Sequence, residues 1–406
     1  MSNTVNIRNG LRRSGRKLKS APCSIAYFGA SNGLIRNGWR FQVHARLNET
    51  FSHEIPHREI NCCLGAIGSL IGSFLARQRL SDGRPDLAFV EFSQTDLWLG
   101  ITQDMAATSV EALVRIIKSY NPDCEICFLY YPSLGSEDHR KGLLSPVEKV
   151  YEKIADHYGI PSINVGKYVM EVAQSGEMSL AGETGAPPLF RRDMLHPTID
   201  GNRKIATFLG DALLELLDDR GEHPAITEMP ASLGTQNIDD WRIYDPTAGM
   251  ISGPFTRTRK TGPGIDYTLP LSRATPAAVD CFSLHPGAIM SFKIRGHLAG
   301  ICLVLGPTSG VIRYTCGDKV IVRALFNKAC NADRVAVYAP YPDFDLSRPF
   351  ALQDVAIELV DSLPGAPRSA DMVPPFPPSK RTFDVVRLFI IGSLVIGDSQ
   401  PTGNHG

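Results

Sequence analysis

The pattern of apolar runs and turn residues changes near the middle of this sequence, and that change narrows the possible folds more than any other feature. Up to residue 224, short apolar runs alternate with amphipathic stretches of helical length, a pattern typical of a parallel sheet with helices on both faces. From residue 241 onward, short β-rich runs follow one another through glycine and proline turns, without helical stretches between them. A chain of 406 residues is long enough for the two parts to be separate domains.

The first part predicts a three-layer α/β/α domain over residues 23–224. Apolar residues recur at helical spacing in its amphipathic stretches, and each stretch is long enough to connect two parallel strands. The expected strands are Ser24–Phe28, Leu87–Phe92, Glu125–Tyr131 and Pro161–Asn164, and the expected helices are Val110–Tyr120, Pro146–Tyr158 and Gly201–Asp219.

The second part predicts an all-β sandwich, similar to a jelly roll, over residues 241–397, which could bind glycans. Residues 225–240 are rich in proline, glycine and polar side chains and are expected to form a linker. The basic residues 1–22 and the tail 398–406 are expected to be flexible. The expected strands are Gly287–Ile294, Leu298–Leu305, Gly310–Cys316, Lys319–Phe326, Arg334–Tyr338, Phe350–Leu359 and Phe383–Ile391.

The charge of the chain is balanced, with 42 Lys and Arg residues against 42 Asp and Glu residues. A nucleic-acid binder or an anionic-membrane binder needs a net basic surface, so neither partner is expected. The longest apolar run, Leu388–Gly397, is about half of what a membrane-spanning helix needs. Because no apolar segment follows the basic N-terminus, we expect a cytoplasmic protein, and export by a route without such a signal stays open.

The 9 cysteines are scattered and mostly lie inside apolar strings, which is typical of buried free thiols. Cys124 and Cys127 form a CxxC pair, but they lie in an expected strand, where residues three apart point to opposite faces. His285 and His297 flank a strand and are expected to be structural or surface residues. We therefore expect neither a metal site nor a cofactor.

The segment IAYFGASNG, from Ile25 to Gly33, is an apolar strand that runs into a glycine-flanked turn with a serine. Ligands of an open α/β sheet bind at the carboxyl ends of its strands, so Ser31 lies where chemistry is expected. The turn could expose the serine hydroxyl with free backbone N–H groups around it. The same serine could instead be an ordinary helix N-cap.

The segment DMLHP places Asp193 and His196 three residues apart, so that both side chains can face the same way in a turn or a short helix. A carboxylate in this position can accept the Nδ1–H of the imidazole, select its tautomer and stabilise the imidazolium form. The alternative is a capping aspartate beside a surface histidine.

Two further segments could supply hydrogen-bond donors to a reacting oxygen. CLGAIGS contains Gly65 and Gly68, at which the backbone N–H could come close to that oxygen. The strand LAFVEFSQTD ends in Thr95 and Asp96, and a polar loop at the end of a central strand could present side-chain donors.

In combination and in this order, the segments resemble the SGNH, or GDSL-like, hydrolase family over residues 23–218. The resemblance implies that Ser31 in FGAS is the nucleophile, with Ala30 where the family usually has aspartate. It also implies that Asp193 and His196 complete a catalytic triad with this serine.

The resemblance further implies an oxyanion hole formed by the N–H groups of Ser31 and Gly65 and by a third donor. The third block of the family usually reads Gly-x-Asn-Asp, and its asparagine is that third donor. Here the block reads SQTD, so Thr95 stands at the asparagine position. Loss of one such donor costs about 2.7–4 kcal/mol of transition-state stabilisation, unless Thr95 or the neighbouring Gln94 replaces it.

The implied reaction removes acetyl or another small acyl group from a polysaccharide or oligosaccharide, so the expected partner is a glycan or an acylated small molecule. Asp96 and Trp98 follow the strand of the third block, and Tyr130 and Tyr131 end another strand. These four side chains could line a sugar-binding surface, although packing explains each of them more simply.

Three alternatives stay open at this point. The same serine could transfer an acyl group to a sugar hydroxyl, as in an O-acyltransferase, or the fold could bind glycans without turnover. A glycan-cleaving enzyme could use carboxylates such as Glu91, Asp96 and Asp193, because retaining glycosidases need two carboxyl groups about 5 Å apart. The oligomeric state is not readable from the sequence.

Overall fold

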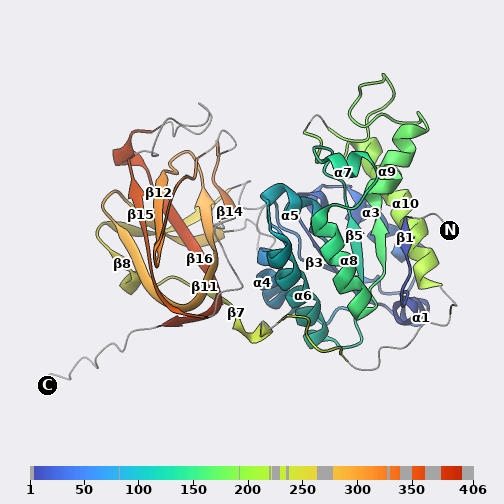
Figure 1. Ribbon diagram of the computed structural model, residues 1–406, viewed down its shortest axis with the longest axis horizontal. Helices are drawn as coiled ribbons and strands as arrows, with labels where there is room; N and C mark the ends of the chain where they lie inside the picture. Colours follow the sequence, from blue (N-terminus) through green and yellow to red (C-terminus); the bar gives the residue numbers. More distant parts are fainter. Residues whose placement is uncertain are drawn as a thin grey trace. The chain divides into compact units, whose positions relative to one another are not determined.

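The computed structural model describes residues 4–81, 83–191, 193–218, 221, 229–234, 237–262, 278–326, 330–338, 350–361 and 376–395. The chain divides into two compact units, Met1–Ile238 and Asp239–Gly406 (Figure 1). The expected tail 398–406 and parts of the expected linker 225–240 lie outside the described residues.

The first unit is built on a largely parallel sheet. Its described strands are β1 (Val5–Asn6), β2 (Ser24–Gly29), β3 (Arg58–Asn61), β4 (Leu87–Glu91), β5 (Glu125–Tyr130) and β6 (Ser162–Asn164). They follow the order β1-β6-β5-β4-β2-β3, and every neighbouring pair is parallel except β1 and β6. Because β3 and β4 lie on opposite sides of β2, the topological switch point, where open α/β sheets bind ligands, lies between β2 and β4.

Helices cover both faces of this sheet. They are α1 (Arg12–Ser20), α2 (Ser31–Leu34), α3 (Trp39–Thr50), α4 (Ser69–Leu80), α5 (Ser93–Leu99), α6 (Gln103–Tyr120), α7 (Glu137–Arg140), α8 (Pro146–Tyr158), α9 (Val165–Gln174) and α10 (Ile199–Leu217). α4, α6 and α8 pack together on one face, and α1, α3 and α10 on the other (Figure 1). The predicted three-layer fold is confirmed. Every helix in the described part of the chain is too short or too polar to cross a membrane.

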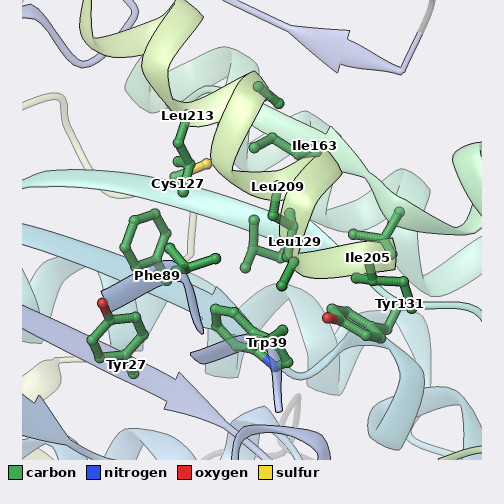
Figure 2. Close-up of a cluster of buried hydrophobic side chains, with 14 of the residues drawn as sticks. Tyr27, Trp39, Phe89, Cys127, Leu129, Tyr131, Ile163, Ile205, Leu209 and Leu213 are labelled. Atoms are coloured by element: carbon green, nitrogen blue, oxygen red, sulfur yellow. The ribbon is translucent and has the colours of Figure 1, made fainter. Parts of the chain in front are cut away.

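A buried core lies between α10 and the sheet. Ile205, Leu209 and Leu213 are spaced four residues apart along α10, so they share one face of the helix. Figure 2 shows these three side chains beside Cys127 and Leu129 of β5. The packing fixes the helix whose N-terminus directly follows the DMLHP segment.

The predicted bounds agree with the structure where local signals are strong. Pro146–Tyr158 is α8 as predicted, because Ser145 and Glu148 form a capping box and Gly159 ends the helix in the left-handed conformation. The sequence prediction lacks β3, since Arg58–Asn61 is a polar and charged strand without an apolar run. It also starts α6 too late, because the first turns of that helix are polar.

The prediction of a flexible extension over residues 1–22 is wrong for the described residues of that segment. β1 pairs with β6 at the edge of the sheet, and α1 packs on α10. Leu11 and Leu18 are both 0% exposed in this packing. The basic side chains pair with acidic partners inside the unit: Arg8 with Glu152 and Asp156, Arg13 with Asp123, Lys17 with Asp86, and Lys19 with Asp218.

Part of the expected linker packs on the first unit. The carboxylate of Glu111 in α6 accepts the N–H groups of Leu233 and Gly234 at 2.6 and 2.8 Å. Arg115, one turn further along α6, donates to the Pro230 carbonyl at 3.0 Å. These contacts attach the described residues of the segment to the α/β domain.

The second unit is all β, and its described strands pair with one another in the antiparallel sense. The strands are β7 (Trp241–Tyr244), β8 (Ile251–Ser252), β9 (Phe255–Thr261), β10 (Ala278–Leu284), β11 (Ile289–Leu305), β12 (Val311–Cys316), β13 (Lys319–Ala324), β14 (Arg334–Tyr338), β15 (Leu352–Val360) and β16 (Phe383–Val395). Their main path is β13-β12-β15-β11-β16-β10-β9, and their inward side chains form one apolar core. The predicted sandwich-like β domain is confirmed.

Two long strands, β11 and β16, form the centre of the second unit. The sequence prediction divides β11 in two near Gly296, whereas the strand continues through this residue. Gly296 pairs with Gly392 of β16 at φ angles of 130° and 122°, and a β-carbon on either glycine would collide with the opposite backbone. The paired glycines let the two strands approach closely, where the sequence suggests a turn.

Candidate active site

Ser31 lies directly after β2, at the switch point of the sheet. β2 ends at Gly29, Ala30 is the N-cap residue of α2, and Ser31 is the first residue of this short helix. The alternative that Ser31 is itself an N-cap is therefore wrong. A first helical residue has no intrahelical acceptor for its N–H, so this group is available to a ligand.

Asp193, His196 and Ser31 form one chain of hydrogen bonds, although 165 positions separate Ser31 from His196. Asp193 Oδ2 lies 2.8 Å from His196 Nδ1, and His196 Nε2 lies 2.8 Å from Ser31 Oγ. Because a carboxylate only accepts, Nδ1 carries the ring proton, and Nε2 of the neutral imidazole is free to accept from the serine hydroxyl. This arrangement can activate a serine for attack.

The segment that carries Asp193 and His196 is a tight turn before α10. Phe190 and Pro197 pair across the turn as an antiparallel bridge. The Arg191 N–H donates to the His196 carbonyl at 2.8 Å, which closes the turn further. Proline at position 197 disfavours a helical backbone at His196, so α10 starts only after the turn.

The carboxylate of Asp193 is held by the turn itself. Its Oδ1 accepts the N–H groups of Leu195 and His196, both at 3.0 Å, and Met194, between Asp193 and Leu195, has a φ of 61°, an unfavourable angle for a side-chain-bearing residue. Partial burial acts to raise the pKa of Asp193, but these two N–H groups and the imidazole outweigh it. The pKa of Asp193 therefore lies below its ordinary value, and the carboxyl stays ionised.

Gly65 and Thr95 lie on the two elements that the resemblance assigns to the oxyanion hole. Gly65 is in the turn after β3, where a β-carbon would meet only Leu34, at 3.8 Å, and its N–H has no acceptor within the described residues. Thr95 is buried in the first turn of α5, and its hydroxyl makes no hydrogen bond to the described part of the chain. The assignment of the Gly65 N–H and the Thr95 hydroxyl as oxyanion donors stays a prediction.

Gln94 does not replace the missing asparagine. Its Nε2 donates to the Pro132 carbonyl and, at 3.2 Å, to the Leu195 carbonyl, while its Oε1 accepts from Asn32 Nδ2 at 2.8 Å. Both N–H groups of the side-chain amide are used, so neither is left for an oxyanion. Sequence reasoning missed Asn32 and Leu195 as partners because they lie 62 and 101 positions from Gln94.

The prediction of Asp96 as a substrate contact is wrong, because the side chain is buried. Its two oxygens accept from the Ser69 N–H at 2.7 Å and from the Tyr151 hydroxyl at 2.6 Å. Burial raises the pKa of Asp96 to about 6 against the effect of these hydrogen bonds. Asp96 therefore joins α5 to α4 and α8 inside the fold.

The two tyrosines are also buried, and the prediction that they stack on a sugar is wrong. Tyr130 donates to Glu152 Oε1 at 2.7 Å, and Tyr131 lies in the core against Trp39, as Figure 2 shows. Trp98 differs from them, because its side chain is 57% exposed on α5. Of the four predicted sugar contacts, Trp98 alone has a side chain that reaches the surface of its unit.

The carboxyl groups do not suit the glycan-cleaving alternative. Glu91 and Asp96 are both buried, and Asp193 is engaged with His196. Burial raises the pKa of Glu91 to about 8. No pair of these carboxylates is presented for attack and protonation at a glycosidic bond.

The remaining candidate ligands are structural. Cys124 and Cys127 are free and buried, as are most of the other cysteines. His285 Nε2 lies 3.2 Å from Thr256 Oγ1, and His297 is buried against the ring of Phe350. Among the described residues, no three His, Cys, Asp or Glu side chains are placed to hold a metal ion.

Known proteins resemble this chain at two levels. Residues 24–204 match the GDSL-like Lipase/Acylhydrolase family. A solved structure of a two-domain esterase (CEX) active on acetylated mannans has a TM-score of 0.68 at 14% identity and covers 96% of this chain and 100% of its own. The structure of such an esterase co-crystallized with mannopentaose has a TM-score of 0.65 at 15% identity and covers 97% and 100%. No curated protein sequence matches the chain.

At these identities the structural likeness shows the fold, an α/β domain followed by a β domain. The family match starts at β2, ends inside α10 and includes the whole Asp193–His196–Ser31 chain of hydrogen bonds. Sequence match and site geometry thus agree on the same segment, and residues 24–204 of this chain form a GDSL-like lipase/acylhydrolase domain.

Proposed function

We propose that this protein is a serine esterase that removes acetyl or another small acyl group from a polysaccharide or oligosaccharide. The observation that carries the proposal is the hydrogen-bonded chain Asp193–His196–Ser31 in a GDSL-like hydrolase domain. A serine hydroxyl that donates to a carboxylate-oriented imidazole is prepared to attack an ester carbonyl.

The reaction proceeds in two halves. His196 Nε2 accepts the Ser31 proton as Oγ attacks the ester carbonyl, and the tetrahedral intermediate collapses when His196 returns that proton to the leaving sugar oxygen. The resulting acyl–serine ester is then attacked by a water molecule that His196 deprotonates. Collapse of the second intermediate releases the free acid and restores the Ser31 hydroxyl.

Asp193 supports both halves of the reaction. Its carboxylate fixes the Nδ1–H tautomer of His196 and stabilises the imidazolium that exists while the ring holds the transferred proton. The lowered pKa of Asp193 keeps this charge in place as the pH falls below neutrality.

The N–H groups of Ser31 and Gly65 are proposed to hold the oxyanion, with the Thr95 hydroxyl as the third donor. Each such donor contributes about 2.7–4 kcal/mol to transition-state stabilisation. Within the described residues, the Gly65 N–H and the Thr95 hydroxyl make no hydrogen bond, which supports this assignment.

An acetylated glycan is the proposed substrate class. The two-domain esterase with the same fold over 96% of this chain is described as active on acetylated mannans, and we extend this class to the present chain. Trp98 supports the choice, since its exposed indole lies on α5, which begins at the switch point of the sheet. Aromatic faces of this kind pack well against sugar rings.

Turnover of p-nitrophenyl acetate by wild type and Ser31→Ala tests the nucleophile. We expect a loss of about a thousandfold or more in Ser31→Ala and no change in the exposed-site control Ser52→Ala. Equal rates in wild type and Ser31→Ala would show that the nucleophile is misassigned.

Product assays with the same protein then test the substrate class and distinguish hydrolysis from acyl transfer. Acetate release from acetylated oligosaccharides is expected for an esterase, whereas transfer of the acetyl group to a sugar hydroxyl would identify an O-acyltransferase. A fluorophosphonate should label wild type rapidly and His196→Ala slowly, because the serine hydroxyl needs the imidazole to accept its proton.

A further inference from the structure

One buried amide side chain joins two loops and the short helix α2 at the carboxyl edge of the sheet. Gln94 is the second residue of α5, directly after β4, and is 4% exposed. Its Nε2 donates to the carbonyls of Pro132 and Leu195, and its Oε1 accepts from Asn32 Nδ2. Pro132 lies in the loop that follows β5, Leu195 in the loop that precedes α10, and Asn32 in α2, the short helix that follows β2.

Two of the three contacts lie next to the reacting groups in the sequence. Asn32 directly follows Ser31, and Leu195 directly precedes His196. Asn32 Nδ2 also approaches the Leu195 carbonyl, at 3.4 Å. Gln94 therefore connects α2, which carries the nucleophile, to the loop that carries the base.

The peptide units on both sides of Leu195 are held by specific hydrogen bonds. Its N–H donates to Asp193 Oδ1 at 3.0 Å, and its carbonyl accepts from Gln94 at 3.2 Å. The preceding residue, Met194, has a positive φ, a conformation that persists only where the surroundings enforce it. The bond from Gln94 is one of the contacts made to this turn.

We propose that Gln94 is a positioning residue for the Ser31–His196 pair. It holds the Leu195 carbonyl, and through it the imidazole, at the 2.8 Å separation from Ser31 Oγ over which a proton can pass. The expected fall of kcat in Gln94 variants rests on the proposed esterase function. The expected displacement of the turn at residues 193–196 does not. A catalytic group displaced by about 1 Å can cost about a hundredfold in rate.

Gln94→Met tests the proposal, because methionine keeps the length of the side chain and removes its hydrogen bonds. We expect kcat for p-nitrophenyl acetate to fall about 10–100-fold while KM changes less than about threefold, since the base is misplaced and the binding surface is intact. A purely structural role would lower stability without this split between kcat and KM.

Ser73→Ala is the matched control for the loss of a buried polar group. The Ser73 hydroxyl is buried and contacts the carbonyls of Ser69 and Ser109 at 2.9 and 2.7 Å, in α4 and α6. A fall of kcat in Gln94→Met that is absent from Ser73→Ala supports the proposal. Equal kcat values in wild type and Gln94→Met overturn it.

A second variant serves if Gln94→Met does not fold, as judged by its circular dichroism. Gln94→Glu keeps the side-chain length and the acceptor for Asn32 and removes the amide donors to Leu195 and Pro132. The same fall of kcat at nearly constant KM is expected, and wild-type kcat in this variant overturns the proposal.

Crystal structures of wild type and the folded Gln94 variant separate this inference from the proposed function. If wild type shows no Ser31-dependent ester hydrolysis, the esterase proposal fails. A displaced turn at residues 193–196 in the variant then still supports the positioning role. A His196 ring that keeps its 2.8 Å separation from Ser31 Oγ overturns it.

Discussion

Glu91 ends β4, and its carboxyl group is buried beside the turn that leads to Ser31. It pairs in register with Gly29 of β2, where a β-carbon would lie 3.1 Å from Glu91 Oε2. Burial raises the pKa of Glu91 to about 8, the Ala30 N–H opposes the rise, and the nearby Asp96 adds to it. The carboxyl is therefore mostly uncharged in the folded protein at neutral pH.

Glu91→Gln is expected to change how stability depends on pH. Between the ordinary glutamate pKa of 4.5 and about 8, the folded state keeps a proton that the unfolded chain has released. The free energy of unfolding of wild type therefore falls as pH rises through this window, by up to about 1.4 kcal/mol per pH unit from this group, and levels off above it.

Glutamine does not titrate, so the stability of Glu91→Gln relative to wild type should rise with pH across the same window. Urea unfolding at several pH values measures this difference. The exposed substitution Glu54→Gln is the control and should show no such slope. A stability difference that is independent of pH would contradict the buried, protonated state of Glu91.

At the scale of elements, the start of α10 decides where the DMLHP turn lies, because the helix begins three residues after His196. Gly201, in its first turn, packs directly on the Leu189 carbonyl, which also accepts the N–H of Thr198 at 2.9 Å. A β-carbon on Gly201 would collide with this oxygen. The missing side chain thus lets the helix and the strand-like segment before the turn approach each other.

Gly201→Ala is expected to lower the free energy of unfolding by about 1–3 kcal/mol and to reduce kcat, because backbone must move beside the turn. Gly210→Ala in the same helix is the control. There the three atoms nearest to a β-carbon belong to the Arg46 side chain, which can shift more easily than backbone, and alanine favours the helix by up to about 1 kcal/mol. Thermal unfolding and p-nitrophenyl acetate turnover compare the two, and equal effects would argue against the close contact at Leu189.

The whole molecule consists of two units, each with its own buried core. In the first unit, that core includes Leu11 and Leu18 from the N-terminal segment. Burial of a leucine side chain contributes about 1.5–3 kcal/mol, whereas an exposed ion pair contributes about 0–1 kcal/mol. Apolar packing, more than the basic side chains, therefore holds this segment in place.

Deletion of residues 1–22 is expected to destabilise the first unit by at least about 3–6 kcal/mol, from the two leucines alone. Differential scanning calorimetry should show a transition at lower temperature. The double variant Arg13→Ala, Lys19→Ala removes two ion pairs whose basic side chains are 54% exposed and should melt close to wild type. A deletion variant that melts like wild type would refute the structural role of the segment.

Local patterns predicted the fold class of both units, whereas the resemblance to the SGNH family singled out the three central residues of the site. Hydrophobic periodicity and turn residues act over a few positions, so the alternation of strands and helices is visible in the chain itself. Asp193 and His196 could be paired in advance because only two residues separate them. The position of Ser31 after an apolar strand made it a candidate, and the family resemblance implied its role as the nucleophile.

Packing between distant segments settled the rest. Gln94 contacts carbonyl and amide groups 38 to 101 positions away, and Lys17 reaches Asp86 across 69 positions. Asp96 and Tyr130 read as surface candidates in the sequence, yet helices from elsewhere in the chain bury them. The exposure of a side chain and its long-range hydrogen bonds depend on how remote parts of the chain pack together. A short stretch of residues therefore does not determine them.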